Sequence, residues 1–190
     1  MRQIRRQTVI TLVLVVLCGF LAGQTAAQVP SNGFSLKHEV VINAPTSEVY
    51  RSMVQQIGEW WNPQHTYSGD SKNLSIDARP GGCFCETLPT GGVEHMRVVY
   101  FVPGEMLRLS GGLGPLQASG VAGSLSWKLT SSDSKATIVE VTYVVGGFME
   151  GGFERVAPAV SKVIGEQLRR LKLFVETGRP SQETEQPSGA

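Results

Sequence analysis

Residues 153–177 read FERVAPAVSKVIGEQLRRLKLFVET, a stretch with the length and the apolar spacing of a long amphipathic helix. Apolar side chains recur every three or four residues, which places them on one face of a helix. They are Val156, Val160, Ile164, Leu168, Leu171 and Val175. Pro158 stands early, where a missing N–H costs little, and Gly178 followed by Pro180 is a helix stop signal. A helix of about 25 residues spans roughly 37 Å, enough to cross a small sheet. The apolar face therefore needs a partner surface, which the upstream chain must provide.

The first 27 residues, 1–27, have the layout of a secretory signal peptide. Basic residues from Arg2 to Arg6 precede an apolar run at 9–22, and small residues follow as far as Ala27. This order predicts cleavage near Ala27. The apolar run is shorter than the about 20 residues of a membrane span, so an uncleaved anchor is the alternative and would be the only membrane contact. The sequence therefore predicts a periplasmic or secreted protein.

One domain is predicted over residues 33–177, after a short linker at 28–32. Residues 178–190 are mostly Pro, Ser, Gln and Glu, a composition that buries too little apolar surface to order itself, so we expect a disordered tail. The formal net charge of +1 gives no reason to expect a nucleic-acid partner. The composition leaves the oligomeric state open.

Short β-branched stretches separated by glycine pairs precede the long helix. Glycine makes up 22 of 190 residues, and pairs such as Gly81-Gly82 mark turns and strand ends. A helix from Thr46 to about Ile57 is expected after the first strand. We predict strands at residues 34–43, 74–78, 83–88, 93–102, 106–110, 123–130 and 136–145. The order strand, helix, six strands, long helix indicates an α+β domain with an antiparallel sheet of about seven strands.

Four motifs in this order resemble those of the SRPBCC, or START-like, superfamily. Residues 38–50, HEVVINAPTSEVY, are similar to its strand-to-helix step with A-P-x-x-x-V. Residues 77–86, DARPGGCFCE, resemble the P-G-G-x-F-x-E turn of the branch that includes polyketide cyclases and activators of heat-shock-protein ATPases. Residues 103–109, PGEMLRL, resemble the P-x-x-x-L-x-L turn of that branch, and the long helix resembles the last helix of the family.

The resemblance implies a helix-grip fold, in which a curved antiparallel sheet wraps around the C-terminal helix and leaves an apolar cavity. Members of the superfamily bind lipids, sterols, polyketides or hormones there, and a minority are enzymes. An exported chain departs from the cytosolic chaperone activators, so their activity is not carried over. We therefore expect a small apolar ligand, and no cofactor, between sheet and helix.

A predicted hairpin brings together a Glu, a His and an Arg. If Leu88 faces Val93, Glu86 falls opposite His95, and Arg97 lies on the same face. A few polar anchors on an otherwise apolar face are typical of a ligand pocket. A solvated cross-strand ion pair is the alternative, because a slip of one residue moves the whole set to the other face.

Aromatic and aliphatic side chains complete the predicted ligand-binding set. They are Trp60, Trp61, Phe84, Leu113, Leu116, Phe148, Phe153, Val156 and Val160. The two tryptophans either line the entrance of the cavity or pack in the core. We expect one of them to line the cavity and the other to pack. The leucines lie in a glycine-rich loop that could close one end of the cavity.

On the long helix, we expect the turns near Val156 and Val160 to cover the cavity and the turns after them to pack as core. His65 and Tyr67 either gate an entrance or belong to an ordinary surface loop, which we favour.

Cys83 and Cys85 are two residues apart on a predicted strand. Their Cα atoms would lie about 6.6 Å apart with poorly aimed side chains, so an intrachain disulfide is not expected without a local kink. With His95 they do not match the spacing of a structural zinc site, so we expect no metal.

Three functions are compatible with this sequence. The first, which we favour, is a non-catalytic protein that holds a small apolar molecule, with Glu86, His95 and Arg97 as orienting groups. The second is an enzyme of the cyclase or aromatase type in which His95 and Glu86 act as acid and base. The third is a non-catalytic interaction protein with a filled core.

Overall fold

A computed structural model describes residues 32–132 and 135–181. The predicted signal peptide and most of the predicted linker and tail lie outside these ranges. The long helix is α3, Val156–Thr177. The strands are β1 Gly33–Ile42, β2 Leu74–Ile76, β3 Cys83–Leu88, β4 Gly91–Val102, β5 Met106–Ser110, β6 Gly120–Ser131 and β7 Thr137–Phe148.

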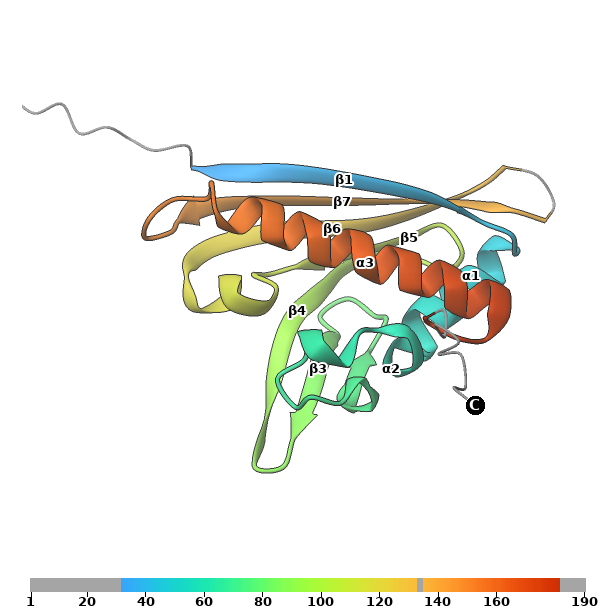
Figure 1. The fold of residues 1–190 in the computed structure, drawn as a ribbon, viewed down its shortest axis with the longest axis horizontal. Helices are drawn as coiled ribbons and strands as arrows, with labels where there is room; N and C mark the ends of the chain where they lie inside the picture. The colour runs from blue at the N-terminus through green and yellow to red at the C-terminus, as the bar shows by residue number, and fades with distance from the viewer. Residues whose placement is uncertain (1–31, 133–134, 182–190) are drawn as a thin grey trace, which may run out of the picture.

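The seven strands form one antiparallel sheet in the order β1-β7-β6-β5-β4-β3-β2. Figure 1 shows α3 lying across this sheet, nearly parallel to β1 and β7, while β3 and β4 bend away from it. This is the predicted α+β helix-grip arrangement, and the fold prediction is confirmed. No helix in residues 32–132 and 135–181 is long and apolar enough to cross a membrane.

The predicted core turns of α3 are buried against the sheet. Ile164, Leu168 and Leu171 are almost completely removed from solvent. Gly165 allows the helix to approach β1, because a Cβ at this position would lie 3.0 Å from the ring of His38. The same ring is held by Ser161, whose Oγ lies 3.0 Å from Nε2 of His38. The helix ends at Gly178, which adopts a φ of 76° and donates its N–H to the carbonyl of Phe174.

The first helix is shorter than predicted, and β6 and β7 are longer. Helix α1, Thr46–Gln55, has Gln56 as its C-cap, and a short α2, Ile57–Trp60, follows. Glycines that the sequence suggested as strand ends lie within the β6–β7 ladder instead. Gly123 is required there because a Cβ would lie 2.6 Å from the ring of Tyr143.

Candidate functional site

A cavity of about 390 Å³ lies between α3 and the end of the sheet formed by β2, β3 and β4. Its volume falls within the range of about 300–1,000 Å³ for small-molecule sites. The wall from α3 consists of Val156, Ala159, Val160, Val163 and Ile164. The opposite wall consists of Trp61, Leu74, Phe84 and His95, and loops contribute Gln64, His65, Thr66, Tyr67, Leu113, Gly114 and Pro115. The cavity is therefore apolar over most of its wall and polar where the first loop meets it.

A β-bulge in β4 places His95 in this wall. The hairpin turns more tightly than expected, with Leu88 opposite Gly91, so Glu86 pairs with Val93 rather than with His95. Phe84 then pairs with Met96 and Cys85 with Glu94, which leaves His95 as the extra residue of the bulge. Both His95 and Met96 are buried as a result. The predicted meeting of Glu86 and His95 is present, but the predicted register is wrong.

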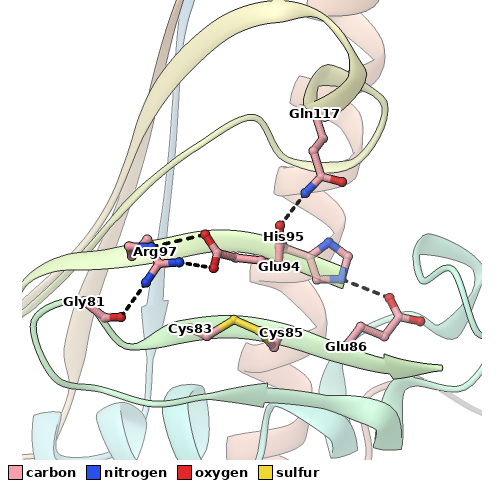
Figure 2. Close-up of a disulfide and its surroundings, with 8 residues drawn as sticks. All are labelled: Gly81, Cys83, Cys85, Glu86, Glu94, His95, Arg97 and Gln117. Atoms are coloured by element: carbon pink, nitrogen blue, oxygen red, sulfur yellow. Dashed lines mark hydrogen bonds and ion pairs between the residues drawn. A yellow bond between two sulfur atoms is a disulfide. The ribbon is translucent and has the colours of Figure 1, made fainter. Parts of the chain in front are cut away.

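Arg97 does not join this pair, and its predicted position on the cavity face is wrong. The extra residue in the bulge reverses the alternation of the strand, so Arg97 lies on the outer face. Its guanidinium pairs with Glu94 and donates a 3.0 Å hydrogen bond to the carbonyl of Gly81 (Figure 2). Both charged side chains are exposed, and both belong to β4, so this pair is not the cross-strand ion pair that was the alternative prediction.

Glu86 and His95 form a buried hydrogen-bonded pair. Oε2 of Glu86 lies 2.9 Å from Nε2 of His95, and the two residues are 1% and 5% exposed. The carboxylate also accepts the backbone N–H of Tyr67 at 3.0 Å and that of Ser68. Burial acts to raise the pKa of Glu86, but hydrogen bonds from Ser68, Tyr67 and His95 outweigh it and hold this pKa below 4.5. Burial lowers the pKa of His95 below 6.5, against the opposing effect of the carboxylate.

These pKa shifts define the protonation of the pair near neutral pH. Glu86 is a carboxylate and His95 is a neutral imidazole, so Nε2 carries the hydrogen that it donates to Glu86. Nδ1 of His95 is then an acceptor, and it has no hydrogen-bond partner among residues 32–132 and 135–181. Figure 2 shows one ring nitrogen reaching Glu86 and the other without a drawn partner. Nδ1 can accept a hydrogen bond or a proton.

The loop that carries His65 and Tyr67 covers one side of the cavity. The two N–H groups bound by Glu86 tie it to β3, and the hydroxyl of Tyr67 donates to the carbonyl of Gly114 at 3.3 Å. Nε2 of His65 lies 3.3 Å from Oε2 of Glu166 on α3. The loop lies at the surface, as we favoured, since Tyr67 is 56% exposed, and both side chains also line the cavity. That the loop gates an entrance stays a prediction.

The other predicted ligand-binding residues divide into two groups. Trp61, Phe84, Leu113, Val156 and Val160 line the cavity, and whether they contact a ligand stays a prediction. Trp60 is buried in the core and donates its indole N–H to the carbonyl of Ser52 at 3.0 Å. Leu116 is fully buried, and Phe153 packs on Phe34 with ring centroids 5.7 Å apart. Phe148 is 74% exposed. It lies an even number of residues after Val144 on β7, so both side chains are on the outer face of the sheet.

Several wall residues were absent from the predicted ligand set. Ala159 and Val163 stand one helical turn apart on the side of α3 that also carries Val156 and Val160, so helical spacing could have identified them. Ile164 was predicted as packed core, and it is both buried and part of the wall. No sequence signal identifies Gln64, Thr66 or Leu74, because the path of the loop decides their position.

Cys83 and Cys85 form a disulfide, contrary to expectation. The register shift of the β3–β4 pairing falls between Phe84 and Cys85, and the Cα atoms of Cys83 and Cys85 lie 5.3 Å apart, closer than in a regular strand. In Figure 2 the bond runs along β3, beside the Glu94–Arg97 pair of β4, and Glu86 follows it on the same strand. Within residues 32–132 and 135–181, no three His, Cys, Asp or Glu side chains gather closely enough to hold a metal ion.

No protein-family model matches this chain, and a search of curated proteins found no match either. Solved structures do match. A conserved protein of unknown function from Enterococcus faecalis is 15% identical with a TM-score of 0.59, over 82% of this chain and 79% of the other. CalU16 from Micromonospora echinospora is 18% identical with a TM-score of 0.53, over 80% and 79% of the two chains. The di-domain ARO/CYC protein BexL from the BE-7585A biosynthetic pathway is 17% identical with a TM-score of 0.53, over 75% of this chain and 46% of its own. At these identities the likeness shows that the chain shares their helix-grip fold.

Proposed function

We propose that this protein binds a small apolar molecule in the cavity beneath α3 and releases it unchanged. The observation that carries this proposal is the cavity itself, about 390 Å³ in volume and walled mainly by aliphatic and aromatic side chains. A filled core, the third function compatible with the sequence, would leave no such space. The fold that the chain shares with an ARO/CYC protein of a biosynthetic pathway supports a polyketide-like or lipid-like ligand.

The lining also favours an uncharged ligand. Among the described residues that form the wall, none is Asp, Glu, Lys or Arg. A charged group on a ligand would lose its hydration without gaining a counter-ion, which is unfavourable in an apolar site. Apolar surface transferred from water into such a cavity contributes about 25 cal/mol per Å².

Binding can be tested with pyrene, an uncharged fluorophore whose emission bands report the polarity around it. Val163 is half-buried in the wall, so Val163→Trp should fill the cavity and weaken pyrene binding by at least about tenfold. Val144→Trp makes the same change on the exposed outer face of β7 and should leave the affinity within about twofold. Equal binding by the wild type and Val163→Trp would place the pyrene site elsewhere and contradict the proposal.

A second candidate function is acid–base catalysis on the bound molecule, as in a cyclase or aromatase. The observation that favours it is Nδ1 of His95, which has no partner in the described part of the chain and whose ring is oriented by the Glu86 carboxylate. Polyketide-like substrates should then be turned over by the wild type, and His95→Ala and Glu86→Gln should each reduce the rate by about 10²-fold or more. Turnover that is unchanged in both variants would remove this candidate.

A further inference from the structure

We infer that the molecule bound in the cavity carries a hydroxyl group, and that this hydroxyl donates a hydrogen bond to Nδ1 of His95. The inference rests on the proposed function and adds to it the ligand class and the residue that recognises it.

The tautomer of His95 follows from what Glu86 already binds. The carboxylate oxygens accept hydrogens from Tyr67 N, Ser68 N and Nε2 of His95, so all three partners must be donors. The hydrogen of a neutral imidazole is therefore on Nε2. Nδ1 keeps its lone pair, and only a donor can satisfy it.

The location of this acceptor restricts what can reach it. His95 is 5% exposed, and its ring lies near those of Phe84 and Tyr67, with centroids 5.0 and 5.8 Å away. Nδ1 has no partner among the described residues, although the ring forms part of the cavity wall. A buried acceptor without a partner is unfavourable, so a ligand that supplies a donor gains affinity over a ligand of the same shape that does not.

Other common functional groups fit this position less well. A ketone, ester or ether offers only acceptors, which would face another acceptor. A carboxylate would approach the buried charge of Glu86 with no Lys or Arg among the described wall residues to balance it. An ammonium group would have to lose its water in an apolar cavity, while Glu86 is only 1% exposed and is not one of the wall residues. A hydroxyl is neutral and compact, and it donates.

The test compares 2-naphthol with 2-methoxynaphthalene by isothermal titration calorimetry. The two probes share one ring system, but only the first has a hydrogen to donate. We expect the wild type to bind 2-naphthol about tenfold more tightly. In His95→Phe, which keeps an aromatic ring without nitrogen, this preference should disappear. Equal or tighter binding of 2-methoxynaphthalene by the wild type would overturn the inference.

A second measurement needs no variant, in case His95→Phe does not fold. The ring nitrogens of His95 can be followed by NMR in the wild type with ¹⁵N-labelled histidine. The Nδ1 resonance should shift when 2-naphthol is added and should not shift with 2-methoxynaphthalene. An Nδ1 chemical shift that does not change with 2-naphthol contradicts the inference. Pyrene separates the two proposals: if it binds but the naphthol preference is missing, only the hydroxyl inference fails. If none of the three probes binds, the proposed function fails with it.

Discussion

At the scale of single residues, Glu86 connects the cavity wall to the loop above it. It accepts hydrogen bonds from two backbone N–H groups and from His95, so Glu86→Ala leaves three donors without an acceptor. We expect the free energy of unfolding to fall by about 3 kcal/mol. Glu86→Gln keeps one acceptor oxygen and should cost about half as much. Urea denaturation measures both.

Glu94→Ala is the matched control for Glu86. Glu94 sits on the outer face of the neighbouring strand in an exposed pair with Arg97, and such pairs contribute about 0–1 kcal/mol. If Glu86→Ala is as mild as Glu94→Ala, the buried hydrogen bonds contribute little to stability.

His95 should make the stability of the protein depend on pH. Its pKa is lowered in the folded state, so below pH 6.5 the unfolded chain binds a proton that the folded chain does not. The free energy of unfolding should therefore fall as the pH drops below 6.5, with a slope of up to about 1.4 kcal/mol per pH unit from this group. The pKa of Glu86 is also lowered, so a further loss should follow below pH 4.5.

Urea denaturation between about pH 3.5 and 8 measures both losses. In His95→Phe the loss that begins near pH 6.5 should be absent, while the loss at lower pH remains. A slope that is the same in both proteins would assign the titration to another group.

At the scale of elements, the approach of α3 to β1 depends on the absence of a side chain at Gly165. A Cβ there would lie 3.0 Å from the His38 ring, which is held by Ser161. We expect Gly165→Val to reduce the free energy of unfolding by about 2 kcal/mol through overpacking. In a His38→Ala background the same change should cost less than about 1 kcal/mol, because the ring is gone. Equal costs in both backgrounds, measured by urea denaturation, would show that the ring does not limit the packing.

The elements differ in how well the sequence predicts them. The stripe from Val156 to Leu171 predicts both the long helix and its buried face, because helical period and burial depend on local spacing. The bulge at His95 has no comparable signal, since one extra residue leaves the composition of a strand unchanged. It reverses the orientation of the side chains that follow until a second irregularity between Val98 and Tyr100, so Arg97 was misplaced, and the cysteine pair beside the bulge was misjudged. Loop residues such as Thr66 reach the cavity through tertiary contacts, which no local pattern encodes.

At the scale of the whole molecule, a ligand in the cavity should stabilise the fold. A ligand that binds only the folded state at a hundredfold excess over its dissociation constant adds about 2.7 kcal/mol to the free energy of unfolding. We expect this gain for the wild type with 2-naphthol, and about 1.4 kcal/mol or less for Val163→Trp at the same concentration if the variant binds at least tenfold more weakly. Urea denaturation with and without ligand measures the difference. A gain of the same size in Val163→Trp would mean that the ligand acts outside the cavity.

The redox state of the β3 disulfide should depend on the cellular compartment in which the protein matured. Its ring encloses only Phe84 between the two cysteines, so by the chain-entropy relation it adds only about 1.5 kcal/mol to global stability. Chains with and without the bond should therefore both fold, and they differ in mass by two hydrogen atoms. Cytosolic thiols are kept reduced, whereas exported proteins oxidise. The mass of the protein taken from its own cells would thus record the compartment in which it matured, independently of any leader sequence.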